Sequence, residues 1–146
     1  MGLADRRHRV TRRFVHPDYN HTFANEYDIA ILYLDTPVAN TTPATLSWDS
    51  IDPSNGGNYS VRGVDAKSHA IEDGMVALWF NTKCQLAYTY GDITDSMACA
   101  TTTQSSMTRG SPLITTKGHG DVVMGLVSWG NNPFVFVRLV SAKNFL

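Results

Sequence analysis

Val122-Val-Met-Gly-Leu-Val-Ser-Trp129 is the stretch that decides the fold, because it is rich in β-branched and apolar residues and stops at the turn Gly130-Asn-Asn-Pro133. Such a run predicts a strand. Similar runs, each bounded by Gly, Pro, Asn or Asp, occur at Arg9–Val15, Ile29–Leu34, Met75–Phe80, Pro112–Thr116 and Phe134–Val140. The segment Asn81–Tyr88 favours one or two helical turns. Short strands at this spacing predict an all-β barrel or sandwich rather than an alternating α/β fold.

Length and composition favour one domain over residues 1–146, since 146 residues with 42% hydrophobic content can bury a core. Residues 1–13 carry five arginines against one aspartate, a local charge of +4 in a chain of net charge -1. No nucleic-acid module follows this basic end, so a solvated end or an edge strand is the better interpretation. No apolar run approaches the roughly 18 residues that cross a bilayer. We therefore expect neither a nucleic-acid nor a membrane partner.

Signs of export are mixed. The N-terminus, Met1–His8, lacks the apolar region of a secretory signal peptide. Three glycosylation sequons begin at Asn20, Asn40 and Asn58, and two cysteines, Cys84 and Cys99, lie close enough in sequence to close one loop. Sequons also arise by chance in a chain rich in Thr and Ser, and two cysteines can be buried thiols. Together these features predict a secreted protein, although no signal peptide is present.

Five strings, in one order, resemble trypsin-like serine proteases. His16–Asn20 and Glu26-Tyr-Asp-Ile-Ala-Ile-Leu-Tyr-Leu34 resemble the segment that carries the family's catalytic aspartate. Cys84–Tyr88 with Ile93–Ala100 resembles a disulfide-closed loop of the second barrel. Gly110-Ser-Pro-Leu113 sits at the end of the nucleophile motif, and Gly125-Leu-Val-Ser-Trp-Gly130 matches the strand that pairs with substrate.

The resemblance covers the chain from about Arg9 onward. It implies a trypsin-like double β-barrel whose N-terminal barrel is incomplete, with short helical turns, and places most of the second barrel in 84–136. It also implies a disulfide between Cys84 and Cys99, and it assigns the catalytic aspartate to Asp28.

The departures from the family imply that no catalytic unit is intact. A histidine must act as base for a serine hydroxyl, because serine at its ordinary pKa is a poor nucleophile. That histidine should lie in an Ala-Ala-His-Cys-like context well before Asp28, and neither His8 nor His16 has this context, so the base segment is absent. The nucleophile slot falls on Arg109, which cannot attack an acyl carbon. Ser111 lies two positions late, where the family has glycine, and is interpreted as a turn serine.

Neighbouring positions agree with this interpretation. The resemblance puts Thr108 at the activation aspartate, Met107 at the residue that donates an oxyanion-hole amide, and Thr103 at the primary specificity residue. Asp28 is therefore vestigial, and no activity follows. No cofactor is implied. His21, His69 and His119 lack metal-ligand spacing, so no metal site is predicted either.

Two classes of function stay open. Two segments near the C-terminus resemble the inactive glucanase inhibitor proteins of oomycete plant pathogens. They are Asp121–Gly130 and Val137-Arg-Leu-Val-Ser-Ala-Lys-Asn-Phe-Leu146. This resemblance implies a secreted virulence effector that binds and inhibits a host endo-β-1,3-glucanase. The alternative is a truncated trypsin-like serine endopeptidase, or a nonfunctional fragment of one.

Overall fold

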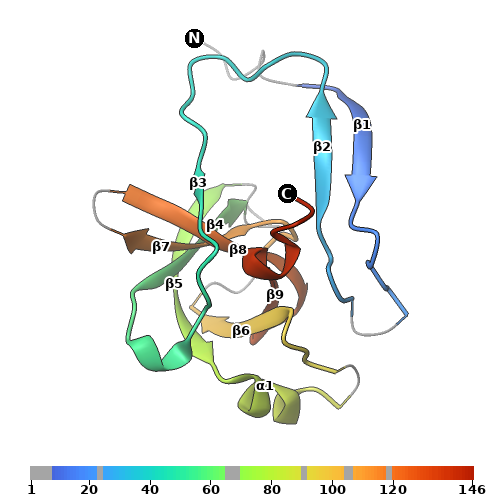
Figure 1. Ribbon diagram of the computed structural model, residues 1–146. Helices are drawn as coiled ribbons and strands as arrows, with labels where there is room; N and C mark the ends of the chain where they lie inside the picture. The colour runs from blue at the N-terminus through green and yellow to red at the C-terminus, as the bar shows by residue number, and fades with distance from the viewer. Residues whose placement is uncertain (1–7, 23–24, 65–69, 90–91, 104–106, 118–119) are drawn as a thin grey trace.

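A computed structural model describes residues 8–22, 25–64, 70–89, 92–103, 107–117 and 120–146 (Figure 1). Its strands are β1 (Val10–Val15), β2 (Ala30–Leu34), β3 (Thr45–Leu46), β4 (Tyr59–Val64), β5 (Ile71–Trp79), β6 (Met97–Thr102), β7 (Pro112–Lys117), β8 (Gly120–Gly130) and β9 (Phe134–Arg138). Its helical segments are η2 (Pro53–Asn55), α1 (Asn81–Ala87) and η3 (Leu139–Ala142). None of these helical segments is long and apolar enough to cross a membrane.

Six strands close into an antiparallel barrel. The hydrogen-bonded order is β8-β7-β4-β5-β6-β9, and pairing of β9 with β8 completes the ring, while β3 adds to β8 in parallel outside it. The strands β1 and β2 form a separate antiparallel sheet beside the barrel (Figure 1). The all-β fold predicted from the sequence is confirmed, since it contains one closed barrel and a smaller sheet.

The barrel is filled by apolar side chains from its own strands. Val61, Leu113 and Phe136 are 0%, 0% and 1% exposed, and they belong to one cluster inside the ring. Burying such side chains supplies the main favourable free energy of folding, about 1.5–3 kcal/mol each before entropy is counted. A second cluster on the outside of the barrel joins it to the C-terminal segment and to Ile29 just before β2. This second cluster fixes where the residues preceding β2 lie.

Several predicted element bounds need correction. The strand expected at Phe134–Val140 ends at Arg138, and η3 begins at Leu139, while the strand expected from Met75 begins at Ile71. Neither β4 nor β6 was predicted. Four of the six barrel strands, β6 to β9, lie in 84–136 or end just after it, so the prediction that this range forms most of the barrel is confirmed, while β4 and β5 precede the range. The strand β6 was missed because it is buried on both faces, which removes the alternation of apolar and polar residues that marks a strand in sequence.

The small sheet presents apolar side chains to solvent on both faces. Phe14 pairs across the sheet with Ile31, and Arg13 on the other face pairs with Leu32. Phe14 is 47% exposed and Leu32 is 55% exposed. The predicted disulfide between Cys84 and Cys99 is confirmed; it joins α1 to β6 with the two Cα atoms 6.2 Å apart.

Candidate functional site

Asp28 is held by a serine on the barrel. The Oγ of Ser128, which is 3% exposed on β8, donates a hydrogen bond to Oδ2 of Asp28 over 2.6 Å. The pairing of β8 with β9 shifts register between Val127 and Trp129, so Ser128 lies at a bulge. A bulge turns a side chain out of the regular alternation, which lets Ser128 reach a residue on the other sheet. The carboxylate therefore has a fixed position.

Asp28 and Arg109 line one cavity of about 300 Å³ between the small sheet and the barrel. Its remaining walls come from the start of β2, from Gly110 and from the Leu126–Val127 segment of β8. No hydrogen bond or ion pair joins Arg109 to any residue that the structure describes. The exposed guanidinium is thus an unpaired positive charge beside a carboxylate that is already hydrogen-bonded.

The turn that presents Arg109 is anchored to β8. The N–H of Gly110 donates to the carbonyl of Val127 over 2.8 Å, and the N–H of Val127 donates to the carbonyl of Ser111 over 2.9 Å. Gly110 has φ +86°, a left-handed conformation that favours glycine. A guanidinium stays protonated in proteins and has only donors, so at this position it can bind an acceptor but cannot attack a carbonyl carbon.

Ser111 is not among the residues that line this cavity. It is 4% exposed, and its Oγ lies 3.2 Å from Oγ1 of Thr108. A Cβ added to Gly63 on β4 would overlap the Ser111 hydroxyl and lie 2.8 Å from its Cβ. Ser111 is therefore buried directly against the backbone of β4 at Gly63.

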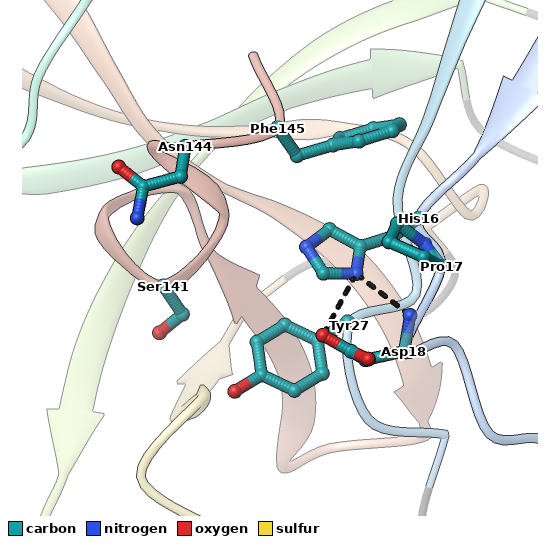
Figure 2. Close-up of a pocket in the computed structure, with 7 residues that line it drawn as sticks. All are labelled: His16, Pro17, Asp18, Tyr27, Ser141, Asn144 and Phe145. Atoms are coloured by element: carbon teal, nitrogen blue, oxygen red, sulfur yellow. Dashed lines mark hydrogen bonds and ion pairs between the residues drawn. The ribbon is translucent and has the colours of Figure 1, made fainter.

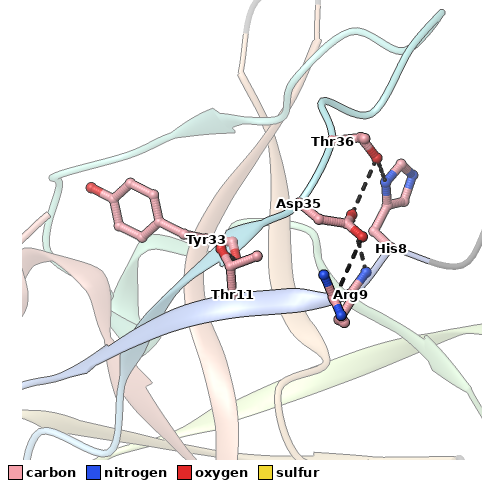
Figure 3. Close-up of polar contacts among 6 residues, drawn as sticks. All are labelled: His8, Arg9, Thr11, Tyr33, Asp35 and Thr36. Carbon is pink, nitrogen blue, oxygen red and sulfur yellow. Dashed lines mark hydrogen bonds and ion pairs between the residues drawn. The ribbon is translucent and has the colours of Figure 1, made fainter.

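None of the three histidines that the structure describes, His8, His16 and His21, bonds to the Asp28 carboxylate. His8 lies at the far end of the small sheet, where its Nδ1 is 3.0 Å from the hydroxyl of Thr36, and Arg9 contacts Asp35 beside it (Figure 3). The backbone N–H of His16 donates to the carbonyl of Ile29 over 3.0 Å. Its ring nevertheless makes no ion pair or hydrogen bond with Asp28.

The His16 ring is held by aromatic neighbours instead. It stacks on Tyr27 with ring centroids 4.6 Å apart and contacts Phe145 at 4.8 Å (Figure 2). The side chain of His21 is exposed, whereas His69 and His119 lie outside the described residues. Among the residues that the structure describes, no imidazole is oriented by Asp28.

Trp129 and Gly130, at the end of the strand that resembles the family's substrate-pairing strand, are closely packed. Trp129 contacts Tyr88 at 4.8 Å, and the Tyr88 hydroxyl donates to the carbonyl of Pro133. Burial raises the pKa of Tyr88. A Cβ at Gly130, which has φ +85°, would overlap the Tyr88 hydroxyl, so glycine is required there. The disulfide packs under this corner, with Cys84 and Cys99 both 0% exposed.

Four other predicted positions are exposed, namely the three sequon asparagines and Thr103. Asn20, Asn40 and Asn58 are all exposed, so an oligosaccharide would meet solvent at each of them. Thr103 lines a hollow with Met75 and Ala77 of β5, and this hollow shares no lining residue with the Asp28 cavity. Sequence reasoning missed Ser128, although the Ser-Trp-Gly string that contains it carries the signal.

Comparisons with known proteins agree on one family. A family model described as trypsin matches residues 3–145. Kallikrein-11 of Mus musculus is 27% identical over 150 residues, which cover 92% of this chain and 52% of the relative. Glucanase inhibitor protein 3 of Phytophthora infestans is 27% identical over 154 residues, 90% of this chain and 57% of the relative. Glucanase inhibitor protein 2 of Phytophthora sojae is 27% identical over 154 residues, which cover 90% of this chain and 51% of the relative.

The chain spans about half the length of these curated relatives. A solved structure of kallikrein-related peptidase 10 superposes with a TM-score of 0.74 at 22% identity, and covers 94% of this chain and 70% of that chain. At this identity the superposition establishes the fold.

Proposed function

The chain belongs to the trypsin family, and on this premise we propose that it is a catalytically inactive homologue that acts by binding another protein. The observation that carries the proposal is the cavity that Asp28 shares with Arg109, the residue to which the motif match assigns the nucleophile slot. Histidine, serine and aspartate act as a unit in this family, so losing two of them leaves at most weak residual catalysis. Asp28 has its serine partner Ser128, and no imidazole among the described residues bonds to it.

A protease scaffold without chemistry still offers a binding surface. Loops on a rigid barrel commonly carry recognition, and losing catalysis does not remove them. Arg109 adds a charged group with five donors that can pair with a carboxylate of a partner. A stable complex would bury roughly 1,200–2,000 Å² in total. We place the centre of this interface at the cavity lined by Asp28 and Arg109.

The proposed partner is a host endo-β-1,3-glucanase. The support is similarity to two glucanase inhibitor proteins of Phytophthora species, each 27% identical over about nine-tenths of this chain. We propose that the protein is secreted and acts as a virulence effector outside the cell. The disulfide supports this location, since such bonds persist in oxidising compartments. Glycosylation at Asn20, Asn40 and Asn58 remains a prediction that fits it.

The test is to titrate a purified endo-β-1,3-glucanase with the folded chain while measuring hydrolysis, together with a pull-down from plant apoplastic fluid. We expect inhibition at micromolar protein or below, with loss of inhibition in Arg109→Glu. Arg13→Glu is the matched control, because Arg13 is an exposed arginine on β1 rather than in the cavity. Inhibition that is equal in both variants would remove Arg109 from the interface.

The alternative is a truncated trypsin-like serine endopeptidase, or a nonfunctional fragment of one. It is compatible with the match of the trypsin family model to residues 3–145. No inhibition and no recovered hydrolase, with a chain shown to be folded, would reject the inhibitor proposal and support the fragment.

A further inference from the structure

A second cavity, of about 380 Å³, lies where the segments flanking the small sheet meet the C-terminal residues (Figure 2). Its apolar walls are Pro17, Tyr27 and Phe145, and its polar groups belong to His16, Asp18, Ser141 and Asn144. It shares no lining residue with the cavity of Asp28 and Arg109. Its volume is at the lower end of the range for small-molecule sites.

His16 places a hydrogen-bond donor inside this cavity. The side chain is 8% exposed, and its Nδ1 accepts a hydrogen bond from the N–H of Asp18 over 3.1 Å. A backbone amide can only donate, so Nδ1 carries the lone pair and the neutral ring carries its hydrogen on Nε2. Figure 2 shows that second ring nitrogen facing the space between Ser141, Asn144 and Tyr27.

The Nε2–H group has no partner among the residues that the structure describes. This edge of the ring is open to the cavity, so the donor can pair with an acceptor from outside the chain. His16 is therefore a largely buried side chain whose Nδ1 is paired and whose Nε2–H faces the cavity, and the rim residues Asp18 and Asn144 are exposed.

The lining selects the chemical class of the ligand. It contains one carboxylate, Asp18, and no lysine or arginine, which disfavours an anion. The Nε2–H donor disfavours an ammonium group, which has no acceptor. A hydroxyl satisfies both conditions, since it can accept from His16 and donate to Asp18 or Asn144. The rings of Tyr27 and Phe145 suit a ligand that also has a flat apolar face.

We propose that this cavity binds a neutral, polyhydroxylated ring of the size of one sugar residue. His16 donates to one ligand hydroxyl, Asp18 and Asn144 accept from others, and the aromatic walls cover the apolar face of the ring. This inference is independent of the glucanase proposal, because it uses none of the residues that line the Asp28 cavity.

The test is an NMR titration of the full chain, labelled with ¹⁵N, with methyl β-D-glucopyranoside as the probe. We expect saturable shifts of the His16 ring nitrogens and of the Asp18 and Asn144 amides. Asp18→Ala and Asn144→Ala should each weaken binding about ten-fold, as loss of a hydrogen bond to the ligand requires. Asp92→Ala and Asn131→Ala, at exposed residues outside the cavity, are the matched controls and should leave binding unchanged.

Three further probes test the chemical class. Sodium acetate and methylammonium chloride should give no saturable shift at His16, and the open-chain polyol sorbitol should bind at least several-fold more weakly than the glucoside. The proposal is overturned if the glucoside gives no saturable shift, if either ion binds as well as the glucoside, or if the two cavity variants bind like their controls. Equal binding of sorbitol would overturn the sugar-ring assignment. Unchanged amide shifts elsewhere establish that each variant is folded.

Discussion

Gly63→Ala should destabilise the barrel because its new methyl group has no space. The added Cβ would overlap the Ser111 hydroxyl and lie 2.8 Å from the Ser111 Cβ. Ser111 cannot retreat, since its carbonyl accepts from Val127 over 2.9 Å and its N–H donates to Thr108 over 3.2 Å. Overpacking a closed core costs about 1–3 kcal/mol, and two blocked contacts place this substitution near 2–3 kcal/mol.

The Ser111 variants separate this clash from other effects. In Gly63→Ala/Ser111→Gly both colliding atoms are gone, so we expect most of the lost stability to return. Gly63→Ala/Ser111→Ala keeps the Cβ at 2.8 Å and should recover little. Gly120→Ala is the control, because nothing lies within 4 Å of its added Cβ; it should change stability by less than about 0.5 kcal/mol.

The assay is urea unfolding followed by tryptophan fluorescence. With m near 2 kcal/mol/M, a loss of 2–3 kcal/mol lowers the midpoint by about 1–1.5 M. A midpoint for Gly63→Ala within about 0.2 M of the wild type would refute the packing described for Ser111. Equal rescue by alanine and glycine at position 111 would refute it as well.

Three other changes probe the fold. The Cys84→Ala/Cys99→Ala variant should lose about 3 kcal/mol in urea unfolding, because the disulfide closes a loop with a sequence separation of 15; a loss under 1 kcal/mol would contradict the chain-entropy argument. Arg138→Met should cost about 1–3 kcal/mol, since Nη1 of Arg138 donates to the carbonyl of Ile51 over 2.9 Å and methionine leaves that carbonyl unpaired. Burial raises the pKa of Tyr88 above its ordinary 10.0, so the contribution of the neutral phenol to folding stability is complete below pH 10 and is lost as pH rises through the raised pKa. The free energy of unfolding of the wild type should therefore fall more steeply in this pH range than that of Tyr88→Phe. Parallel profiles of unfolding free energy against pH would be evidence against the burial of Tyr88.

The fold can be predicted from the sequence where strand residues alternate between apolar and polar or are mostly β-branched and apolar, as in Val122–Trp129. It does not follow for β6, Met-Ala-Cys-Ala-Thr-Thr, because small residues buried on both faces give no period of two. At the end of β9, Leu139 and Val140 favour strand by propensity. The chain turns there instead, as Arg138 bonds to the carbonyls of Ile51 and Met97.

The candidate site was predictable only in part. Asp28 and Arg109 came from matching motifs to a family, which assigns positions along the chain. The hydrogen bond from Ser128 to Asp28 joins residues 100 positions apart, and the contact of His16 with Phe145 joins the two ends of the chain. Such contacts depend on how the small sheet sits against the barrel, and local sequence carries no direct record of that packing.

Intact-protein mass spectrometry after treatment with a serine-directed phosphonate tests the central claim most directly, that this member of the trypsin family has no working nucleophile. The folded chain should remain at its unmodified mass while an active trypsin in the same tube is labelled completely. The reason is that the motif match assigns the nucleophile slot to Arg109, and that Ser111, 4% exposed, packs against β4. Stoichiometric labelling of Ser111, or of any other serine of this chain, would contradict the account.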